Sequence, residues 1–312
     1  MKTIVVTGGA GFIGSHLCEF LLSKGNKVIA IDNFATGRRE NISGFADNKN
    51  FTLLEHDITK KIPLKERVHA IYNLASLASP LFYQKMPLET LLVNSLGTLN
   101  ALELAKKNNA KFLQASTSEV YGDPLQHPQK ESYYGNVNTV GARSCYDEGK
   151  RFAETAAMEY GKKYGLEIRI ARIFNTYGPR MRSDDGRVVP NFIVQALQGK
   201  PLTVYGKGKQ TRSFCYISDQ VAGLTALMGS DYAMPVNIGN PEEITILTLA
   251  EKIKSLTGSE SEIKFLPLPE DDPARRRADI SLAREKLGWQ PKVPLEDGLE
   301  KTVEWFKTEP KQ

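Results

Sequence analysis

Residues 4–14 read Ile-Val-Val-Thr-Gly-Gly-Ala-Gly-Phe-Ile-Gly, an apolar run that leads through a glycine-rich turn into an apolar helical pattern. Gly8 permits a tight turn, Gly11 lets the backbone approach a pyrophosphate, and Gly14 allows a helix to pack closely on the preceding strand. The N-terminus of that helix would face the phosphates. The stretch therefore predicts the first strand, turn and helix of a dinucleotide-binding fold.

The alternation of strand and helix continues along the first half of the chain. Short runs rich in Val, Ile and Leu predict strands at 4–7, 28–32, 51–56, 70–74, 112–116 and 168–173, and helical spacing predicts helices at 12–24, 88–108 and about 146–164. Strands that are apolar on both sides and separated by helices form a parallel sheet covered on both faces. The sequence therefore predicts an α/β fold with a doubly wound parallel sheet of the Rossmann type.

A carboxylate follows at the position that selects the cofactor. Asp32 ends the second expected strand, where it can accept hydrogen bonds from the adenosine ribose hydroxyls and would repel a 2′-phosphate. This favours NAD over NADP, although Arg38 and Arg39 lie close enough in the sequence to leave NADP open. The expected cofactor site comprises Gly8, Gly11, Phe12, Ile13, Gly14, Asp32, Asn33, Thr36, Gly37, Asp57, Ile58, Leu74 and Ser76.

The alternation ends after residue 173, where loops and short elements rich in Gly and Pro begin. Residues 214–229 again have the pattern of a strand and a helix, which could rejoin the large domain. We therefore expect a NAD-binding Rossmann domain at 1–174, rejoined by about 210–235. Residues 175–312 would form a smaller, discontinuous C-terminal lobe that binds the substrate.

Tyr146 and Lys150 are four residues apart in a helical pattern, which places both side chains on one face. A tyrosine with a pKa of about 10 must lose roughly three units to act as a base near neutrality, which costs about 4 kcal/mol. An ammonium about 4 Å away supplies about that much at an effective dielectric constant near 20, so Lys150 could make Tyr146 a usable base. The hydroxyls of Ser116, Thr117 and Ser118, at the end of the fifth expected strand, would hydrogen-bond the same reacting oxygen. A surface pair with no catalytic role stays open as the alternative.

Composition and charge narrow the function classes. The chain has 312 residues, of which 41% are hydrophobic and 25% charged, an ordinary globular composition. The 41 Lys and Arg and the 36 Asp and Glu are spread along the chain and form no basic stripe, so nucleic-acid binding is not expected. The one dense run, Arg275-Arg276-Arg277, is either a solvated face or a site for an anionic small molecule.

Metal sites, disulfides and membrane segments are not expected either. The four histidines are scattered without metal-ligand spacing. Cys18, Cys145 and Cys215 are odd in number and widely spaced, which fits a reducing cytoplasm better than a disulfide framework. Neither a secretion signal nor an apolar run of about 18 residues is visible.

Three motifs carry a family resemblance: the glycine turn, the segment 146–150 that reads Tyr-Asp-Glu-Gly-Lys, and the segment 172–179 that reads Arg-Ile-Phe-Asn-Thr-Tyr-Gly-Pro. With these motifs in order, the chain resembles, over almost its whole length, the extended short-chain dehydrogenase/reductases that act on nucleotide sugars. More narrowly, the segments 115–124, 144–151, 185–189 and 210–214 are similar to those of the UDP-glucuronate decarboxylases, the UDP-xylose synthases.

The narrower resemblance implies a lyase with tightly bound NAD that converts UDP-glucuronate to UDP-xylose. In the related sugar 4,6-dehydratases an Asp stands where this chain has Ser118, and it protonates the leaving C6 hydroxyl. A uronic acid needs no such acid, because oxidation at C4 turns its carboxyl group into that of a β-keto acid, which loses CO₂. Protonation at C5 and re-reduction at C4 then give the pentose.

The same resemblance implies a role for each site residue. Tyr146 would be the acid/base at O4, Lys150 would tune it and hold the nicotinamide ribose, and Thr117 would hydrogen-bond O4. Glu119 resembles the catalytic carboxylate of the family, and Arg276 resembles the arginine used for substrate orientation and C5 protonation. Thr176 and Arg187 resemble positions in the cofactor site, and the expected substrate contacts are Ser118, Asn175, Tyr205, Arg212 and Arg276.

The sequence leaves alternative functions open. A UDP-uronate 4-epimerase or a nucleotide-sugar 4,6-dehydratase would share the C4 oxidation, and a non-catalytic NAD-binding scaffold would share the fold. Leu77, Leu92 and Ala278 stand where the family has Pro, Lys and Pro, which bears on the exact sugar. The resemblance also implies a soluble homodimer that pairs the helices at 88–108 and 146–164.

Overall fold

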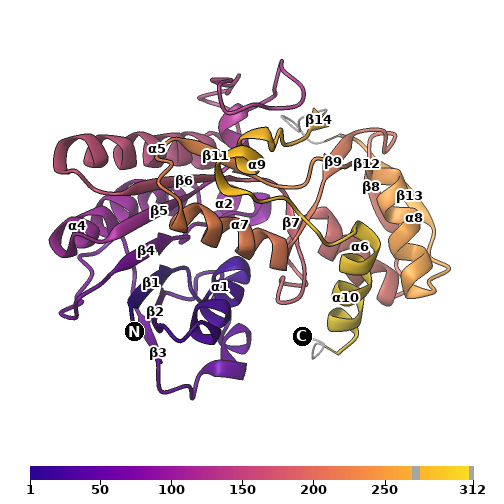
Figure 1. The fold of residues 1–312 in the computed structure, drawn as a ribbon. Coiled ribbons are helices and arrows are strands. Elements are labelled where there is room, and N and C mark those ends of the chain that lie inside the picture. Colours follow the sequence, from indigo (N-terminus) through magenta and orange to yellow (C-terminus); the bar gives the residue numbers. More distant parts are fainter. Residues whose placement is uncertain (269–274, 309–312) are drawn as a thin grey trace.

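The computed structural model describes residues 1–268 and 275–308 (Figure 1). Seven strands form its central parallel sheet: β1 Thr3–Thr7, β2 Lys27–Asp32, β3 Phe51–Glu55, β4 Ala70–Asn73, β5 Lys111–Thr117, β6 Ile168–Ile173 and β11 Pro235–Ile238. Their order across the sheet is β11-β6-β5-β4-β1-β2-β3. The first six begin and end within one residue of the predicted strands, and the predicted doubly wound α/β fold is confirmed.

Helices cover both faces of this sheet (Figure 1). On one face α1 Phe12–Ser23 packs against α7 Ile217–Gly229, and on the other α4 Thr98–Asn108 packs against α5 Ser144–Tyr164. Val5 and Val6 are both fully buried, because successive side chains of a strand point to opposite faces and both faces are covered. This double burial is the reason why the strands read as unbroken apolar runs.

The predicted helix at 88–108 forms as three consecutive segments. They are α3 Pro87–Leu92, the π-helical turn η3 Val93–Gly97, and α4. A Cβ added at Gly97 would lie 2.8 Å from the Cδ1 atom of Ile58, so the glycine allows this turn to sit against the loop that follows β3. Shorter elements complete this half: α2 Pro80–Lys85, η1 Arg39–Asn41, η2 Ser43–Phe45 and η4 Ser118–Tyr121.

The described residues after β6 also build three small sheets and, besides α7, four helices. β7 Thr176–Tyr177 pairs with β10 Cys215–Tyr216, β8 Leu202–Tyr205 pairs with β13 Ile263–Leu266, and β9 Thr211–Ser213 lies between β12 Glu243–Thr245 and β14 Arg275–Arg276. The helices are α6 Val188–Leu197, α8 Ile246–Thr257, α9 Ser281–Leu287 and α10 Leu295–Thr308. None of the helices in the two described ranges is long and apolar enough to span a membrane.

The seventh strand, β11, was not predicted from the sequence. It follows the expected strand and helix at 214–229, which form as β10 and α7, and it extends the large sheet beside β6. Its sequence Pro-Val-Asn-Ile begins with a proline and places the polar Asn237 in a fully buried position, so it lacks the apolar run of the other strands.

Candidate active site

One cavity of about 1020 Å³ lies at the carboxyl ends of the central strands. All the residues that the sequence predicts for the cofactor, catalytic and substrate sites lie on its wall, from Gly8 on β1's turn to Arg276 on β14. Ligands of open parallel sheets bind at this edge. The structure therefore brings together the residues whose roles the sequence proposes.

The nucleotide end of the cavity is built by the glycine turn. Gly8 has a φ of +68°, and a Cβ added at Gly14 would lie 2.0 Å from the carbonyl oxygen of Gly8. No side chain caps the N-terminus of α1 at Gly11, so its first backbone N–H groups point toward this end of the cavity. Because an uncapped helix N-terminus beside a glycine turn is suited to phosphates, these residues fit the pyrophosphate of a dinucleotide.

Asp32 is held in place for ribose recognition. Its carboxylate accepts hydrogen bonds from the backbone N–H of Ala10 and of Phe34, both at 2.9 Å. A Cβ added at Gly37 would lie 2.7 Å from the Oδ1 atom of Asp32, so a glycine at position 37 allows the loop to pass this close to the carboxylate. The carboxylate therefore stays on the cavity wall, where it would repel a 2′-phosphate.

Arg38 and Arg39, the two arginines that could have bound the 2′-phosphate of NADP, contact other parts of the protein. Arg39 forms an ion pair with Glu55 at 2.5 Å and lies over the ring of Phe34. The guanidinium of Arg38 lies 5.8 Å from the ring centroid of Trp305 on α10. Since neither arginine lines the cavity, the geometry favours NAD.

Tyr146 and Lys150 lie on the buried face of α5, as their spacing predicts. Lys150 Nζ donates a hydrogen bond to the carbonyl oxygen of Ala115 at 2.9 Å and lies 5.7 Å from the ring centroid of Tyr146. The Thr117 hydroxyl hydrogen-bonds to the Tyr146 phenol. Tyr146, Lys150 and Thr117 thus form one group at the carboxyl end of β5.

Burial sets the proton affinities of this group. Burial raises the pKa of Tyr146 above its ordinary value, although the hydrogen bond from Thr117 lowers it. Burial also lowers the pKa of Lys150 to about 7. The expected lowering of the Tyr146 pKa by Lys150 is not found in this structure, where the loss of solvent has the largest effect on this pKa.

Glu119 lies between two guanidinium groups beside Tyr146. Arg276 Nη2 donates to its Oε2 at 2.9 Å, Arg276 Nη1 donates to its Oε1, and Arg143 Nη2 donates to its Oε2 at 2.6 Å. Burial opposes ionisation of Glu119, but Arg276 and Arg143 lower its pKa to about 2. The three side chains, called the Glu119 cluster below, carry one net positive charge on the cavity wall.

Comparison with known proteins identifies the family. Residues 5–302 match the family model described as GDP-mannose 4,6 dehydratase. The chain is 56% identical to UDP-glucuronic acid decarboxylase 1 of Danio rerio, over 99% of this chain and 73% of that protein, and 56% identical to UDP-glucuronic acid decarboxylase 1 of Arabidopsis thaliana, over 97% and 69%. The chain belongs to the UDP-glucuronic acid decarboxylase family. This family lies within the extended short-chain dehydrogenase/reductases, as the sequence predicts.

A solved structure with bound ligands has the same fold. UDP-glucuronic acid 4-epimerase from Bacillus cereus, in complex with UDP-glucuronic acid and NAD, superimposes with a TM-score of 0.89 at 32% identity, over 98% of this chain and 99% of that one. The open alternative of a 4-epimerase is thus a related protein with the same architecture.

Three residues at the site were not predicted from the sequence: the half-buried Arg143 and the buried Tyr83 and Asp147. The ring of Tyr83 stacks on that of Tyr146 at 5.2 Å and 9°, and its buried hydroxyl has no hydrogen-bond partner within the described residues. Asp147 is 5% exposed, and burial together with the nearby Glu119 raises its pKa to about 7. Arg143 could have been found from its position three residues before Tyr146, whereas Tyr83 lies in a short helix with no motif.

The later elements contribute further predicted residues to the same cavity: Arg187 of the predicted cofactor site, and Arg212 and Tyr205 of the predicted substrate site. Arg187 is oriented by a two-fold ion pair with Asp185, with contacts of 2.5 and 2.7 Å. Arg212 on β9 is 7% exposed and donates to the carbonyl oxygen of Thr211, while Tyr205 at the end of β8 is 42% exposed. A buried cation and an exposed aromatic ring on the wall of one cavity suit the diphosphate and the base of a nucleotide sugar.

Proposed function

We propose that the chain is a carboxy-lyase that converts UDP-glucuronate to UDP-xylose with NAD. The observation that carries this proposal is the Glu119 cluster beside Tyr146, whose one net positive charge matches the single negative charge of the uronate carboxyl group. The identity to relatives named UDP-glucuronic acid decarboxylase supports the same reaction. Ser118, in place of the acid of the 4,6-dehydratases, is consistent with a substrate that has no C6 hydroxyl group to lose.

Tyr146, Lys150 and Thr117 would carry out the first step, oxidation of the C4 hydroxyl group to a ketone. Tyr146 would take the proton from O4, and the Lys150 ammonium and the Thr117 hydroxyl would stabilise the phenolate. When bound, NAD⁺ supplies the acceptor for the C4 hydride and a positive charge. The raised pKa of Tyr146 makes its phenol a good proton donor to O4 in the reverse direction.

The Glu119 cluster would act on the carboxyl group after that oxidation. With a ketone at C4, the bond between C5 and the carboxyl carbon breaks, CO₂ leaves, and the electron pair moves to O4 as an enolate. Thr117 and Tyr146 can donate hydrogen bonds to this oxygen. Arg276 would orient the sugar for protonation at C5, and re-reduction at C4 leaves no net redox change. Because the pKa of Glu119 is about 2, this carboxylate is ionised at neutral pH and would hold the two arginines rather than supply the proton.

The later elements would hold the UDP part of the substrate. We propose that Arg212 and Asn175 bind the diphosphate, that Tyr205 contacts the nucleoside, and that Ser118 contacts the sugar, while Arg187 and Thr176 lie with the cofactor. In this proposal residues 1–174 and about 210–235 form the NAD-binding domain and the remainder of 175–312 forms the sugar-nucleotide lobe.

The proposed reaction is tested by incubating the purified protein with UDP-glucuronate and NAD⁺ and analysing CO₂ and the sugar nucleotide. We expect release of CO₂ and a product that has lost the carboxyl group, and mass spectrometry would also tell UDP-xylose from a released 4-keto pentose. A product with the mass of UDP-glucuronate would instead support the 4-epimerase and reject the decarboxylase.

We further propose a homodimer that pairs the helical segments at 88–108 and 146–164. Several large apolar side chains are exposed on these segments: Leu88 at 70%, Leu92 at 45%, Leu96 at 47% and Phe152 at 44%. Contiguous exposed apolar side chains are typical of interaction sites. We expect light scattering to give the mass of two chains, and Leu96→Glu with Phe152→Glu to give the mass of one. A double variant that remains dimeric would contradict this interface.

The cysteines are consistent with a reducing compartment. Cys18, Cys145 and Cys215 are all buried free thiols. We propose the cytoplasm as the location, where thiols stay reduced.

A further inference from the structure

Arg276 reaches Glu119 from a segment that has little regular structure of its own. It lies on β14, a strand of two residues that pairs with β9 through Arg275 opposite Thr211 and Arg276 opposite Arg212. The guanidinium nevertheless has to stay within hydrogen-bonding distance of both carboxylate oxygens of Glu119. Additional contacts must therefore hold the backbone next to Arg276.

Gln129 supplies those contacts from the loop that follows η4. Its backbone N–H donates to the carbonyl oxygen of Arg277 at 3.0 Å, and its side-chain Oε1 accepts from the N–H of Arg277 at 2.8 Å. Its carbonyl oxygen accepts from the N–H of Asp279 at 3.0 Å. Gln129 is fully buried, so these three bonds fix the segment 277–279 without competition from water.

Asn237 joins this segment to the turn that carries Glu119. Its Nδ2 donates to the carbonyl oxygens of Gln129 and Asp279, both at 3.0 Å, and its Oδ1 accepts from the Tyr121 hydroxyl at 2.7 Å. Tyr121 is the last residue of η4, two positions after Glu119. One fully buried amide on β11 therefore connects the chain segments of both partners of the Glu119–Arg276 ion pair.

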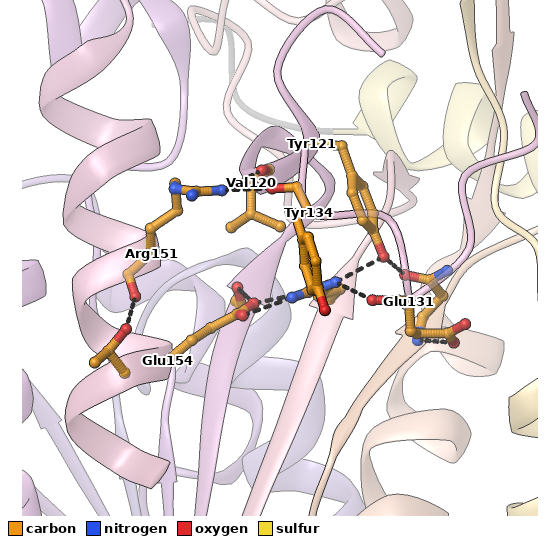
Figure 2. A network of polar contacts seen from close by, with 10 residues as sticks. Val120, Tyr121, Glu131, Tyr134, Arg151 and Glu154 are labelled. Carbon is orange, nitrogen blue, oxygen red and sulfur yellow. Dashed lines mark hydrogen bonds and ion pairs between the residues drawn. The ribbon is translucent and has the colours of Figure 1, made fainter. Parts of the chain in front are cut away.

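The network continues from Tyr121 to the wall of the cavity (Figure 2). The Tyr121 hydroxyl accepts from Arg172 Nη1 at 3.0 Å, and Arg172 donates twice to Glu154, at 2.9 and 2.8 Å. Glu154 in turn accepts from the Ser116 hydroxyl at 2.5 Å, next to Thr117. Figure 2 shows Tyr121, Glu131 and Glu154 converging in this network, and the Asn237 N–H donates to Glu131 Oε1 at 2.8 Å.

We propose that Asn237 and Gln129 are positioning residues that set Arg276 against Glu119. The inference rests on the proposed function, because it assigns Glu119 and Arg276 to the steps after C4 oxidation. Tyr146 and Lys150 are held by α5, which packs directly on β5 and β6, and Asn237 reaches this helix indirectly, through Tyr121, Arg172 and Glu154, whereas it hydrogen-bonds directly to the segment next to Arg276. Disturbing Asn237 should therefore slow loss of CO₂ and C5 protonation more than it slows oxidation at C4.

The test uses Asn237→Asp, which keeps the shape of the side chain but replaces the amide donor by an oxygen. Tyr121→Phe is a milder second variant that removes only the hydroxyl link. Both are mixed with UDP-glucuronate and NAD⁺, and reduced cofactor (absorbance at 340 nm) and CO₂ are followed over the first turnovers. We expect CO₂ release to fall roughly 10- to 100-fold in Asn237→Asp, while the first appearance of reduced cofactor stays within about 2-fold and reduced cofactor accumulates.

Arg169→Met is the matched control for stability. Arg169 is buried at the amino end of β6, far along the strand from the cavity, and donates to the carbonyl oxygens of Ser230 and Ile168. This variant should lower the melting temperature as the test variants do, without accumulation of reduced cofactor.

The inference is overturned if Asn237→Asp and Tyr121→Phe lose stability but keep the wild-type ratio of the rate of CO₂ release to the rate of cofactor reduction. Absence of CO₂ release by the unsubstituted protein would overturn the proposed function and this inference with it.

Discussion

Replacing Tyr146 by Phe is expected to lower CO₂ release from UDP-glucuronate by about 10³-fold, within the range of roughly 10²–10⁴ for loss of a general acid–base group. The substitution removes only the hydroxyl that hydrogen-bonds to Thr117, and the ring can keep its stacking on Tyr83 at 5.2 Å. No reduced cofactor should appear at 340 nm, because the first step is blocked. This separates Tyr146 from the network residues, whose variants should accumulate reduced cofactor.

Tyr160→Phe is the matched control on the same helix. The Tyr160 hydroxyl donates to Glu103 at 2.7 Å on the outer side of α5, away from the cavity. Its loss should leave the CO₂ rate within about 2-fold, as expected for a surface substitution. Wild-type CO₂ release in Tyr146→Phe would remove the hydroxyl from the mechanism.

The fold could be predicted largely because most strands of the sheet are covered on both faces. Val5 and Val6, or Ile29 and Ala30, are buried in succession, and such runs are visible without tertiary information. β11 could not be predicted in this way. Its central Asn237 is buried by partners from η4, from the loop that follows it and from the segment 277–279, which come together only in the folded chain.

The site residues also fall into those that a local sequence pattern predicts and those that only tertiary packing brings to the site. The glycine turn, Asp32 and the pair of Tyr146 and Lys150 have local spacing that reflects their chemistry. Tyr83 reaches the site through packing of α2 near α5, for which the sequence contains no periodic signal. Spacing also could not give the direction of the Tyr146 pKa shift, because that depends mainly on how far solvent is excluded from the phenol in the folded chain.

Replacing Glu119 by Gln is expected to impair both activity and stability. The change leaves the buried guanidinium group of Arg276 and the half-buried one of Arg143 without the carboxylate that pairs with both. Removing one member of a buried ion pair costs about 3–5 kcal/mol in the free energy of unfolding. CO₂ release should fall at least about 10²-fold, because the arginine that orients the sugar loses its anchor.

The pH dependence of that stability loss is a sharper test, because Asp147 lies beside the cluster. Its pKa in the folded protein is raised to about 7, with burial as the main cause and Glu119 next, so between pH 4 and 7 the folded state holds a proton that the unfolded state has lost. Wild-type stability from this group therefore falls as pH rises through that window. The lowered pKa of Glu119 has the opposite sign, and its contribution is lost only as pH falls from about 4.5 toward about 2.

In Glu119→Gln the neighbour that raises the Asp147 pKa is gone, while Arg143 and Arg276 still lower it. Asp147 should then ionise at a lower pH and partly neutralise the two arginines, so the stability of the variant should fall less between pH 5 and 8 than that of the wild type does. The difference in free energy of unfolding between wild type and Glu119→Gln, measured by urea denaturation, is therefore expected to be largest near pH 5 and smaller at pH 8. Glu119→Gln combined with Asp147→Asn is the control, because it removes this compensation and should lose more stability than Glu119→Gln alone at pH 8. A difference that stays constant or grows with pH would show that Asp147 does not respond to the charge of the Glu119 cluster.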